Sequence, residues 1–236
     1  MVKAEITGIG WVTSTGMGCG RNQRRFAMTR GPLPEIKPND IYSDPYPSFR
    51  RMDAYSRLGV TAIAFALQDA GLAEWTEKRK IGVIASSVYG CLRTDVDFYD
   101  TVIPRSKLGS SPALFSYTLP NSFLGEAAIR FGLTGVGFVI NERHPAGRAC
   151  LQAALDHLAG GNPPKILAGV CDLDCPQVFV GQGGLSPGAL FFMIENCPSN
   201  QSNSYGKLIL KRNATLIFDG AEIQDFYGLV QKCLAG

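Results

Sequence analysis

The stretch Val139–Gly147 has the residue types of a strand that passes through a tight turn into a helix. The last side chain of such a turn lies at the N-terminus of the helix, where the dipole and the free N–H groups favour an anion. Thiol enzymes use this position to hold a thiolate at neutral pH. Here the turn carries His144. Because the same field disfavours a protonated imidazole, we expect His144 to be neutral.

Three other patterns have residue types that do chemistry elsewhere. Gly8-Ile-Gly10 follows a strand, but a dinucleotide fingerprint needs a third glycine where this chain has Thr13. Cys171 and Cys175 offer two soft ligands, whereas a structural zinc site needs four in a recognisable spacing. The two histidines of the chain have no fixed spacing to a serine or aspartate that would define a triad. We therefore expect no cofactor and no metal.

The composition is that of an ordinary globular protein, with 236 residues, 45% of them hydrophobic and 18% charged, which excludes disorder. The net charge of +3, from 23 basic and 20 acidic residues, does not favour a nucleic-acid partner. The longest apolar stretch, near Gly59–Leu67, is far shorter than the ~20 residues of a membrane span. Seven scattered cysteines indicate reduced thiols and a cytoplasmic location.

Strands and helices alternate along the chain, which predicts an α/β fold with a mixed sheet in one domain. The expected strands are Glu5–Thr13, Ile81–Val88, Gly137–Asn141, Lys165–Val170, Ala189–Ile194, Lys207–Leu210 and Ala214–Phe218. The expected helices are Asp53–Ala70, Pro120–Phe131, Pro145–Ala159 and a final amphipathic helix that starts at Asp219, with Glu222 completing a capping box. Residues 21–52 are expected to form a surface excursion with little regular structure.

The helix expected to end near Ala159 carries a polar stripe, because Arg148, Gln152 and Asp156 follow one another at intervals of four residues. Such a stripe is costly in a dry core. Either this face is wet or meets a polar partner, or the helix simply packs its apolar side on its own sheet. The final amphipathic helix would cover part of what remains.

Four motifs resemble those of β-ketoacyl-acyl carrier protein synthases and occur in the same order. They are the opening strand Gly8-Ile-Gly10-Trp-Val-Thr-Ser-Thr-Gly16, the run Leu119-Pro-Asn121 with Phe131-Gly-Leu-Thr-Gly135, the strand Leu167–Asp172, and the later strand Ser186–Glu195. The similarity covers about Glu5 to Leu210. It implies one half of the thiolase fold, a mixed five-stranded sheet with helices on both faces. We expect one ketosynthase-like domain over residues 1–236, in which residues 211–236 are a C-terminal extension.

The sequence departs from this family where the family does its chemistry. The nucleophile turn of the family reads Thr-Ala-Cys-Ser/Ala-Ser/Ala-Gly, whereas this chain reads Glu142-Arg-His-Pro-Ala-Gly147, which puts His144 in place of the cysteine. Cys150 lies six residues further on, too far along the helix to replace it. The family's second half supplies both catalytic histidines, and this sequence stops after the first half. We expect no catalytic residue here, and condensation only in complex with an active ketosynthase.

The resemblance implies a non-catalytic accessory subunit, similar to the chain-length factors of type II polyketide systems and to accessory proteins of aryl polyene pathways. Ketosynthases pair through an edge strand, which would put Phe138 and Ile140 at an interface. By the same resemblance Phe115, Tyr117, Leu119 and Phe123 would shape the end of a partner's acyl pocket, unless these residues are ordinary core. The expected partners are a full-length β-ketoacyl synthase, in a heterodimer or heterotetramer, and an acyl carrier protein.

Two other functions remain open at this point. A stand-alone decarboxylase or acyltransferase that acts on acyl thioesters would use His144 as its base. A carrier-protein-binding module would instead receive an acidic acyl carrier protein on surface arginines, unless these are simply solvated. The arginines in question are Arg21, Arg24, Arg25, Arg50, Arg51 and Arg57.

Overall fold

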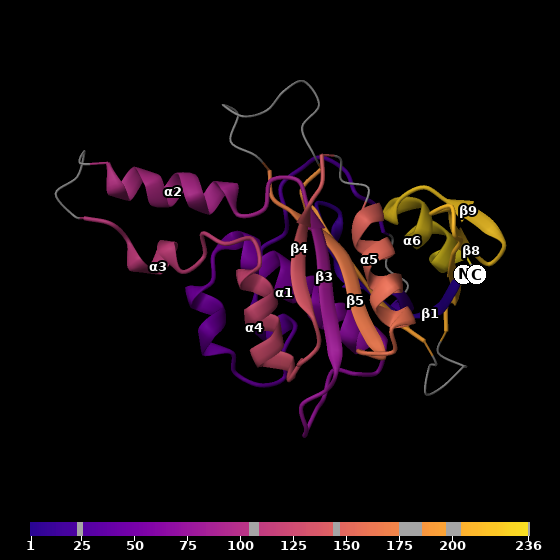
Figure 1. Cartoon of the computed structure of the whole chain (residues 1–236). Helices are drawn as coiled ribbons and strands as arrows, with labels where there is room; N and C mark the ends of the chain where they lie inside the picture. Colours follow the sequence, from indigo (N-terminus) through magenta and orange to yellow (C-terminus); the bar gives the residue numbers. More distant parts are fainter. Residues whose placement is uncertain (23–25, 104–108, 144–146, 175–185, 197–203, 236) are drawn as a thin grey trace.

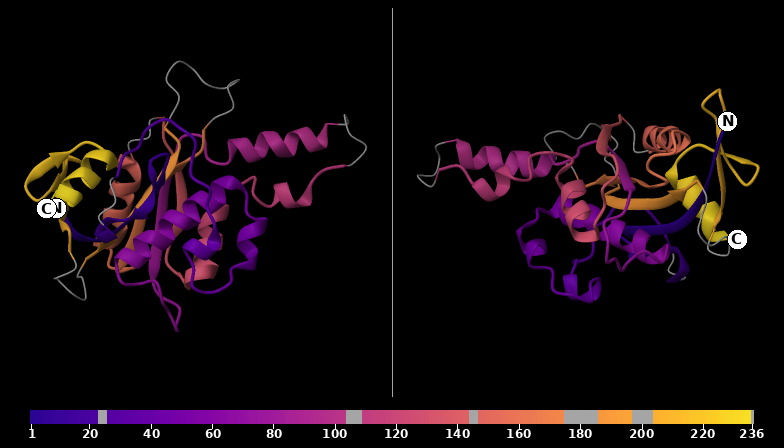
Figure 2. Two further views of the ribbon diagram at one scale, coloured as in Figure 1. Left: turned by 180° about the vertical axis from the view of Figure 1, so that it is seen from behind. Right: turned by 60° about the horizontal axis from the view of Figure 1, so that its bottom comes forward.

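A long mixed sheet with helices on both faces forms the body of the protein (Figures 1 and 2). The computed structural model describes residues 1–22, 26–103, 109–143, 147–174, 186–196 and 204–235. The strands are β1 (Val2–Thr13), β2 (Gly16–Cys19), β3 (Ile81–Ser87), β4 (Gly137–Asn141), β5 (Lys165–Asp172), β6 (Gly188–Glu195), β7 (Gly206–Leu210), β8 (Leu216–Phe218) and β9 (Ala221–Ile223). The α-helices are α1 (Ala54–Asp69), α2 (Leu92–Val102), α3 (Pro112–Phe115), α4 (Ser122–Phe131), α5 (Arg148–Ala159) and α6 (Phe226–Ala235). Three short 3₁₀ helices are η1 (Gly20–Asn22), η2 (Pro38–Asp40) and η3 (Pro47–Arg51).

The strand order β4-β3-β5-β6-β1-β7-β8-β9 contains the five-stranded mixed sheet that the sequence predicts. That unit is β4-β3-β5-β6-β1, in which β3 runs parallel to β4 and β5 and the remaining pairs are antiparallel. The sheet is longer than expected, because β7, β8 and β9 continue it beyond β1 and β2 pairs with the end of β1. The predicted α/β fold class is confirmed.

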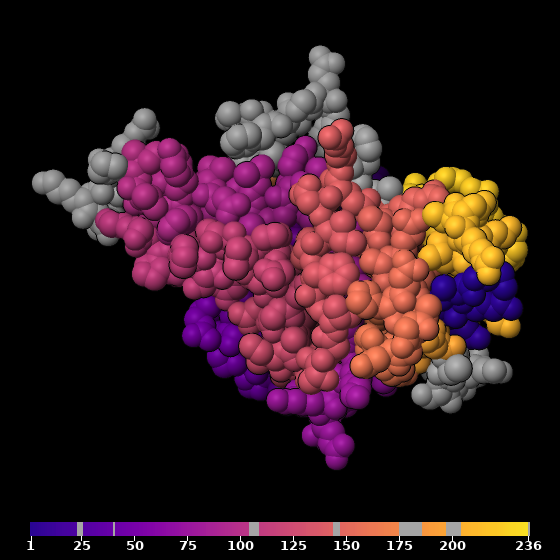
Figure 3. All heavy atoms as spheres, in the orientation of Figure 1, coloured from indigo at the N-terminus to yellow at the C-terminus, as the bar shows by residue number. Residues whose placement is uncertain are grey.

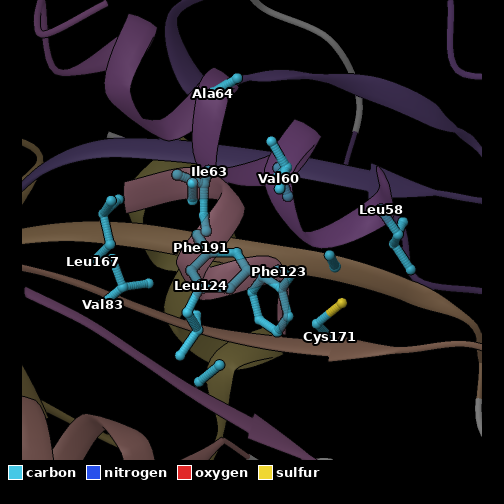
Figure 4. Close-up of a cluster of buried hydrophobic side chains, with 14 of the residues drawn as sticks. Leu58, Val60, Ile63, Ala64, Val83, Phe123, Leu124, Leu167, Cys171 and Phe191 are labelled. Atoms are coloured by element: carbon cyan, nitrogen blue, oxygen red, sulfur yellow. The ribbon is translucent and has the colours of Figure 1, made fainter. Parts of the chain in front are cut away.

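Each face of the sheet carries its own hydrophobic core. One core packs under α1 and α4 and includes Leu58, Ile63, Phe123 and Phe191 (Figure 4). The other packs under α5 and α6 and includes Leu151, Leu155, Phe192 and Phe226. Strands β3 and β6 are buried along their whole length. This explains why they read as nearly continuous apolar runs.

The two glycines of the opening strand bring α1 close to the sheet. A Cβ atom at Gly10 would lie 2.1 Å from the backbone nitrogen of Ala66, and one at Gly8 would lie 2.4 Å from the Ala66 carbonyl oxygen. Helix α1 starts after Asp53, whose side chain accepts a hydrogen bond from the N–H of Ser56 at 2.8 Å. Close packing of helix on strand therefore accounts for the Gly-x-Gly pattern without a nucleotide.

The final helix starts later than predicted, and the capping box at Asp219 and Glu222 is wrong. Asp219 and Gly220 have φ angles of +43° and +85° and form a two-residue turn between β8 and β9. An Asp-Gly pair favours such a hairpin turn. Helix α6 instead begins at Phe226, where the carboxylate of Asp225 accepts a hydrogen bond from the N–H of Gly228 at 2.7 Å.

The segment before α1 is also more than a surface excursion. Tyr42, Phe49 and Met52 are buried and belong to the core under α1 and α4. The ring of Tyr42 lies 5.9 Å from that of Phe49 and 6.4 Å from that of Phe131, measured between centroids. Aromatic burial therefore ties this proline-rich segment to the body even though its regular structure is limited to 3₁₀ turns.

Helix boundaries differ in smaller ways. Helix α5 begins at Arg148 and not at Pro145, because Gly147 has a φ of +64° and cannot belong to the helix; Pro145 itself lies outside the described residues. Helix α2 was not predicted. Among the described residues, no helix combines the length and the apolar character that crossing a bilayer requires.

Candidate functional site: the turn before α5 and an exposed apolar face

The turn before α5 is described on both its sides, while residues 144–146, including His144, lie outside the described residues. Glu142 directly follows β4, and its Oε1 accepts hydrogen bonds from the hydroxyl of Ser86 and from the N–H of Ala149, the latter at 3.1 Å. Ala149 is the second residue of α5. A carboxylate therefore occupies the positive end of this helix, the position that favours an anion.

A second carboxylate holds the same end of the sheet from its other face. Asp172, at the end of β5, is 2% exposed and accepts hydrogen bonds from the Ser87 hydroxyl at 2.8 Å and from the N–H groups of Val88 and Tyr89 at 3.0 and 2.9 Å. Burial raises the pKa of Asp172, and these hydrogen bonds oppose that rise. Ser86 and Ser87 are consecutive residues of β3 and so point to opposite faces. Each of the two serines thus donates to one of the two carboxylates.

The thiol nearest to the turn lies inside the core. Cys150 is fully buried, and its Sγ donates to the carbonyl oxygens of Gly147 at 3.2 Å and Gly169 at 3.3 Å. Burial raises the pKa of Cys150, so the thiol is held protonated and out of contact with solvent. Cys171 is buried as well, and Cys175 lies outside the described residues. The described ranges contain no cluster of three or more metal-ligating side chains.

Helices α2 and α3 project from the body as an arm, here defined as residues 92–103 and 109–119 (Figure 1). Thr94 is the one buried residue of α2, and its hydroxyl hydrogen-bonds to Asp53. Large apolar side chains of the arm are half or more exposed: Tyr99, Val102, Phe115 and Leu119. Several exposed apolar side chains on one projecting part of a protein are typical of a surface that binds another protein.

The four residues predicted to shape a partner's pocket fall into two groups. Phe115 and Leu119 are 63% and 62% exposed. Tyr117 is buried and donates a hydrogen bond from its hydroxyl to Glu126 at 2.9 Å. Phe123 is fully buried in the core under α1 and α4 (Figure 4), and its ring centroid lies 5.3 Å from that of Tyr55. Phe115 and Leu119 thus reach the surface, whereas Phe123 packs within this chain's own core.

Strand β4 lies at one end of the sheet and pairs with β3 alone among the described strands. Phe138, Val139 and Ile140 are half-buried on it, and Phe138 lies 5.8 Å from the ring of His157. The neighbouring helix α4 exposes Ile129. Figure 3 shows α3, α4, β4 and α5 on one continuous side of the molecule. We call this side, with the arm, the β4 face.

Part of the predicted arginine cluster lines a pocket of about 320 Å³ between the start of α1 and the arm. Arg51, Arg57 and Arg93 line it together with apolar and acidic residues, among them Met52, Leu114, Leu173, Asp53 and Asp97. Arg21 lies apart from this pocket: it pairs with the buried Asp69 at 3.3 Å and stacks over the Tyr205 ring at 4.6 Å. Arg24 and Arg25 lie outside the described residues.

The polar stripe of α5 has a partner within the chain. Arg148 donates to the carbonyl oxygen of Ala214 at 2.8 Å, and Gln152 donates to the same oxygen at 3.4 Å. Ala214 belongs to the turn between β7 and β8. Asp156 stays exposed. The stripe therefore meets both the C-terminal part of the chain and solvent.

Residues 41–190 match the family described as Beta-ketoacyl synthase, N-terminal domain, and the chain belongs to this family. It is 26% identical over 139 residues to 3-oxoacyl-[acyl-carrier-protein] synthase I, chloroplastic, of Arabidopsis thaliana, a match that covers 57% of this chain and 29% of that protein. The chain thus spans under a third of this curated relative.

Solved structures with the same fold include two that contain chain length factors. The ishigamide ketosynthase/chain length factor superposes with a TM-score of 0.68 at 15% identity, over 88% of this chain and 62% of that one. The ketosynthase ApeO in complex with its chain length factor ApeC from Xenorhabdus doucetiae gives a TM-score of 0.62 at 17% identity, over 84% and 81%. These likenesses show a ketosynthase fold of the thiolase type.

Sequence reasoning missed Glu142, Asp172 and the exposed side chains of the arm. A signal for the two carboxylates was present, because each is the acidic residue at the end of a predicted strand, where a sheet edge meets its loops. The arm offered no comparable signal.

Proposed function

We propose that this chain is a non-catalytic, ketosynthase-like accessory subunit, of the chain-length-factor kind, that pairs with a full-length β-ketoacyl synthase in fatty acid or polyketide biosynthesis. The observation that carries the proposal is the β4 face, where an edge strand adjoins exposed apolar side chains of α4 and the arm. Two observations support a non-catalytic role: His144 stands where the family's turn has its cysteine, and the nearby Cys150 is fully buried. Aryl polyene synthesis is the pathway we favour, and the cytoplasm is the location we favour because reduced thiols persist there.

The pairing would use the edge of β4 that faces away from β3 and pairs with no other strand in the described part of the chain. A strand from the partner would satisfy the unpaired backbone groups of this edge. The same contact would cover Phe138, Val139 and Ile140, which are half-buried in this chain. A stable interface buries roughly 1,200–2,000 Å² in total. One strand edge alone is too small for this, so the contact would also have to include Ile129 of α4 and the exposed side chains of the arm.

Phe115 and Leu119 would then act on the partner's product. Their exposed side chains lie on the arm, and in the complex they would close the end of an acyl pocket in the synthase. Phe115→Ala should lengthen the product without weakening this chain's own fold, because Phe115 is 63% exposed. Tyr227→Ala is the matched control, since Tyr227 is also an exposed aromatic residue but lies on α6.

The experiment is co-expression with a full-length ketosynthase, followed by size-exclusion chromatography with light scattering. We expect a complex of equal subunit numbers for the wild type and its loss in Ile140→Lys. The matched control is Ile217→Lys, since Ile217 is also half-buried on a strand but lies on β8, which pairs on both edges. The proposal is contradicted if the wild type forms no complex with the synthase at micromolar concentration. It is also contradicted if the Ile140→Lys variant still forms the complex.

The arginine-lined pocket favours a second role, the docking of an acidic acyl carrier protein. Arg51, Arg57 and Arg93 come together there from two different parts of the chain, and such clusters attract acidic partners in a salt-dependent way. Binding of acyl carrier protein should weaken strongly between about 50 and 200 mM salt, a range over which the Debye length roughly halves. It should also weaken in Arg57→Glu but not in Arg212→Glu. No binding at low salt would retire this role.

A further inference from the structure

A second pocket, of about 310 Å³, lies near the C-terminal ends of α1 and α4, and it shares no residue with the arginine-lined pocket. Its walls come from residues 41–44, from α1, from the loop at residues 73–75 and from the end of α4. All of these residues belong to the described ranges. The volume is at the lower end of those that hold small ligands.

One wall of this pocket is a tryptophan that the rest of the chain holds in place. The Nε1–H of Trp75 donates a hydrogen bond to the carbonyl oxygen of Arg130 at 3.1 Å. A Cβ atom at Gly132 would lie 2.5 Å from the Trp75 ring, so the ring packs directly on that glycine. Trp75 is nevertheless 38% exposed, and the buried residues Tyr42 and Phe131 also line the pocket. The pocket therefore offers a fixed aromatic surface to an apolar group.

The guanidinium of Arg130 lines the same pocket. Its Cζ lies 5.2 Å from the ring centroid of Tyr42 and 5.0 Å from that of Tyr46, so two aromatic rings hold it. Its Nε is buried without a hydrogen-bond partner, and Arg130 forms no ion pair among the described residues. A guanidinium held in this way is suited to bind a carboxylate through its N–H groups.

Two carboxylates line the pocket as well. Asp44 and Glu74 are both exposed, and neither takes part in an ion pair within the described part of the chain. Arg130 and these two acidic residues thus share one pocket without pairing with one another. Opposite charges in this arrangement leave room between them for a ligand that carries both charges.

We propose that this pocket binds a free amino acid with a large apolar side chain. Arg130 receives the carboxylate of the ligand, and Asp44 and Glu74 receive its ammonium group. The side chain of the ligand packs against Trp75. This role goes beyond the proposed accessory function and does not depend on it, since the pocket lies within the isolated chain.

The experiment is a titration of the ¹⁵N-labelled full chain with L-phenylalanine at neutral pH, followed by NMR of the indole N–H groups. The protein has two tryptophans, and Trp11 is fully buried in the core under α5 and α6, on the other face of the sheet. The Trp75 signal, assigned with Trp75→Phe, should shift to saturation while the Trp11 signal stays in place. Trp11 thus serves as the internal reference.

Two analogues with the same phenyl ring test the need for both charges. 3-Phenylpropionate lacks the ammonium group, and 2-phenylethylamine lacks the carboxylate. Each should bind at least about tenfold more weakly than L-phenylalanine, because each loses one set of charged contacts. An analogue that binds as tightly as L-phenylalanine overturns the proposal. So does the absence of a saturable Trp75 shift up to about 10 mM L-phenylalanine, or a shift of both indole signals together.

Variants test the assigned residues. Arg130→Met keeps an apolar stem between the tyrosine rings and should weaken L-phenylalanine binding about tenfold, whereas Arg212→Met, at an exposed arginine outside the pocket, should not. The double variant Asp44→Asn with Glu74→Gln changes only exposed side chains, so it carries the test if Arg130→Met does not fold.

The double variant should also weaken L-phenylalanine binding about tenfold, but it should not weaken binding of 3-phenylpropionate, which has no ammonium group. Glu77→Gln is its matched control, because Glu77 is exposed on the same loop and does not line the pocket. Unchanged L-phenylalanine binding in the double variant overturns the proposal, as does an equal loss in Glu77→Gln.

Discussion

Phe123 and Phe115 are the same residue type, eight positions apart, but the structure predicts opposite effects on stability when each is replaced by alanine. Phe123 is fully buried, with its ring set edge-on against Tyr55 at 5.3 Å and 6.2 Å from the ring of Phe191. A Cβ atom at Gly59 would lie 2.5 Å from the Phe123 ring, so α1 already packs directly against it. Phe123→Ala would therefore leave a cavity between a helix and a sheet that cannot close.

The expected cost follows from that geometry. Truncating a buried phenylalanine costs about 3–5 kcal/mol, and the edge-on ring contact with Tyr55 places Phe123 near the middle of this range or above, at about 4 kcal/mol. In urea, with an m-value of about 3 kcal/mol/M, the unfolding midpoint should fall by about 1.3 M. For a chain of this size the melting temperature should fall by roughly 8–16 °C.

The assay is urea unfolding followed by circular dichroism, with Phe115→Ala as the matched control. Because Phe115 is 63% exposed, its truncation should change the free energy of unfolding by less than about 0.5 kcal/mol. Two variants that lose equal stability would refute the reasoning. A Phe123→Ala variant as stable as the wild type would do so as well, since it would mean that this ring is not part of the core.

Four further outcomes are expected. Ala214→Gly should gain about 0.5–1 kcal/mol, because Ala214 has a φ of +61° while Arg148 holds its carbonyl oxygen in place; a loss in urea unfolding would contradict this. Tyr205→Phe should lose about 1–3 kcal/mol, since it removes the hydroxyl that hydrogen-bonds to buried Asp69 at 2.7 Å, whereas Tyr227→Phe should be neutral in the same assay. Native alkylation at pH 8.5 with peptide mapping should leave Cys150, Cys171 and Cys233 unlabelled, because burial raises the pKa of each; labelling within minutes would argue against their burial. Burial, with a contribution from Asp69, raises the pKa of Cys19 from 9.0 to about 11, so the native state keeps this proton longer than the unfolded chain and the free energy of unfolding should fall between pH 9 and 11. Cys19→Ala should flatten that fall in urea titrations, and an unchanged slope would count against it.

The sequence predicts best those strands that are covered on both faces of the sheet, because burial on both faces makes them apolar along the chain. Strands β3, β5 and β6 are apolar along their central residues because helices cover both sides of the sheet, and their polar residues stand at the strand ends. Helix α2 escaped prediction for another reason: it projects from the body and buries only Thr94, so no apolar stripe of it packs into the core. Its apolar residue Phe98 instead packs against Phe115 within the arm. The pair Asp219-Gly220 favours a hairpin turn, as the structure shows. The apolar residues that follow it have helical spacing, and this spacing led to the wrong prediction of a helix from Asp219.

The candidate site was harder to predict than the fold. No local pattern separates Phe115 from Phe123, because a glycine on α1, more than fifty residues away, makes room for only one of them. The sequence pattern drew attention to His144, which lies outside the described residues. It gave no sign of the Glu142 carboxylate at the start of α5, because the role of Glu142 depends on Ser86 from a neighbouring strand. Contacts between segments that are distant in the sequence decide whether Phe123 is buried and what Glu142 binds. The spacing of apolar residues along the chain carries no information about such contacts.

The pairing of β1 has a consequence for how the protein is made. β1 is completed within the first 13 residues, but its long partners are β6 and β7, which begin at Gly188 and Gly206. At 5–20 residues per second, a ribosome needs about 10–35 s to bridge the gap from β1 to β6. During that time β3, β4 and β5 can already assemble, while β1 has only the short β2 to pair with, over Gly10–Thr13, and lacks its partner along the β6 edge. Strands β6 and β7, which are synthesised late, therefore complete the middle of the sheet on either side of β1. A nascent chain stalled before β6 would present β1 with one whole edge unpaired, which is prone to aggregation and a target for chaperones.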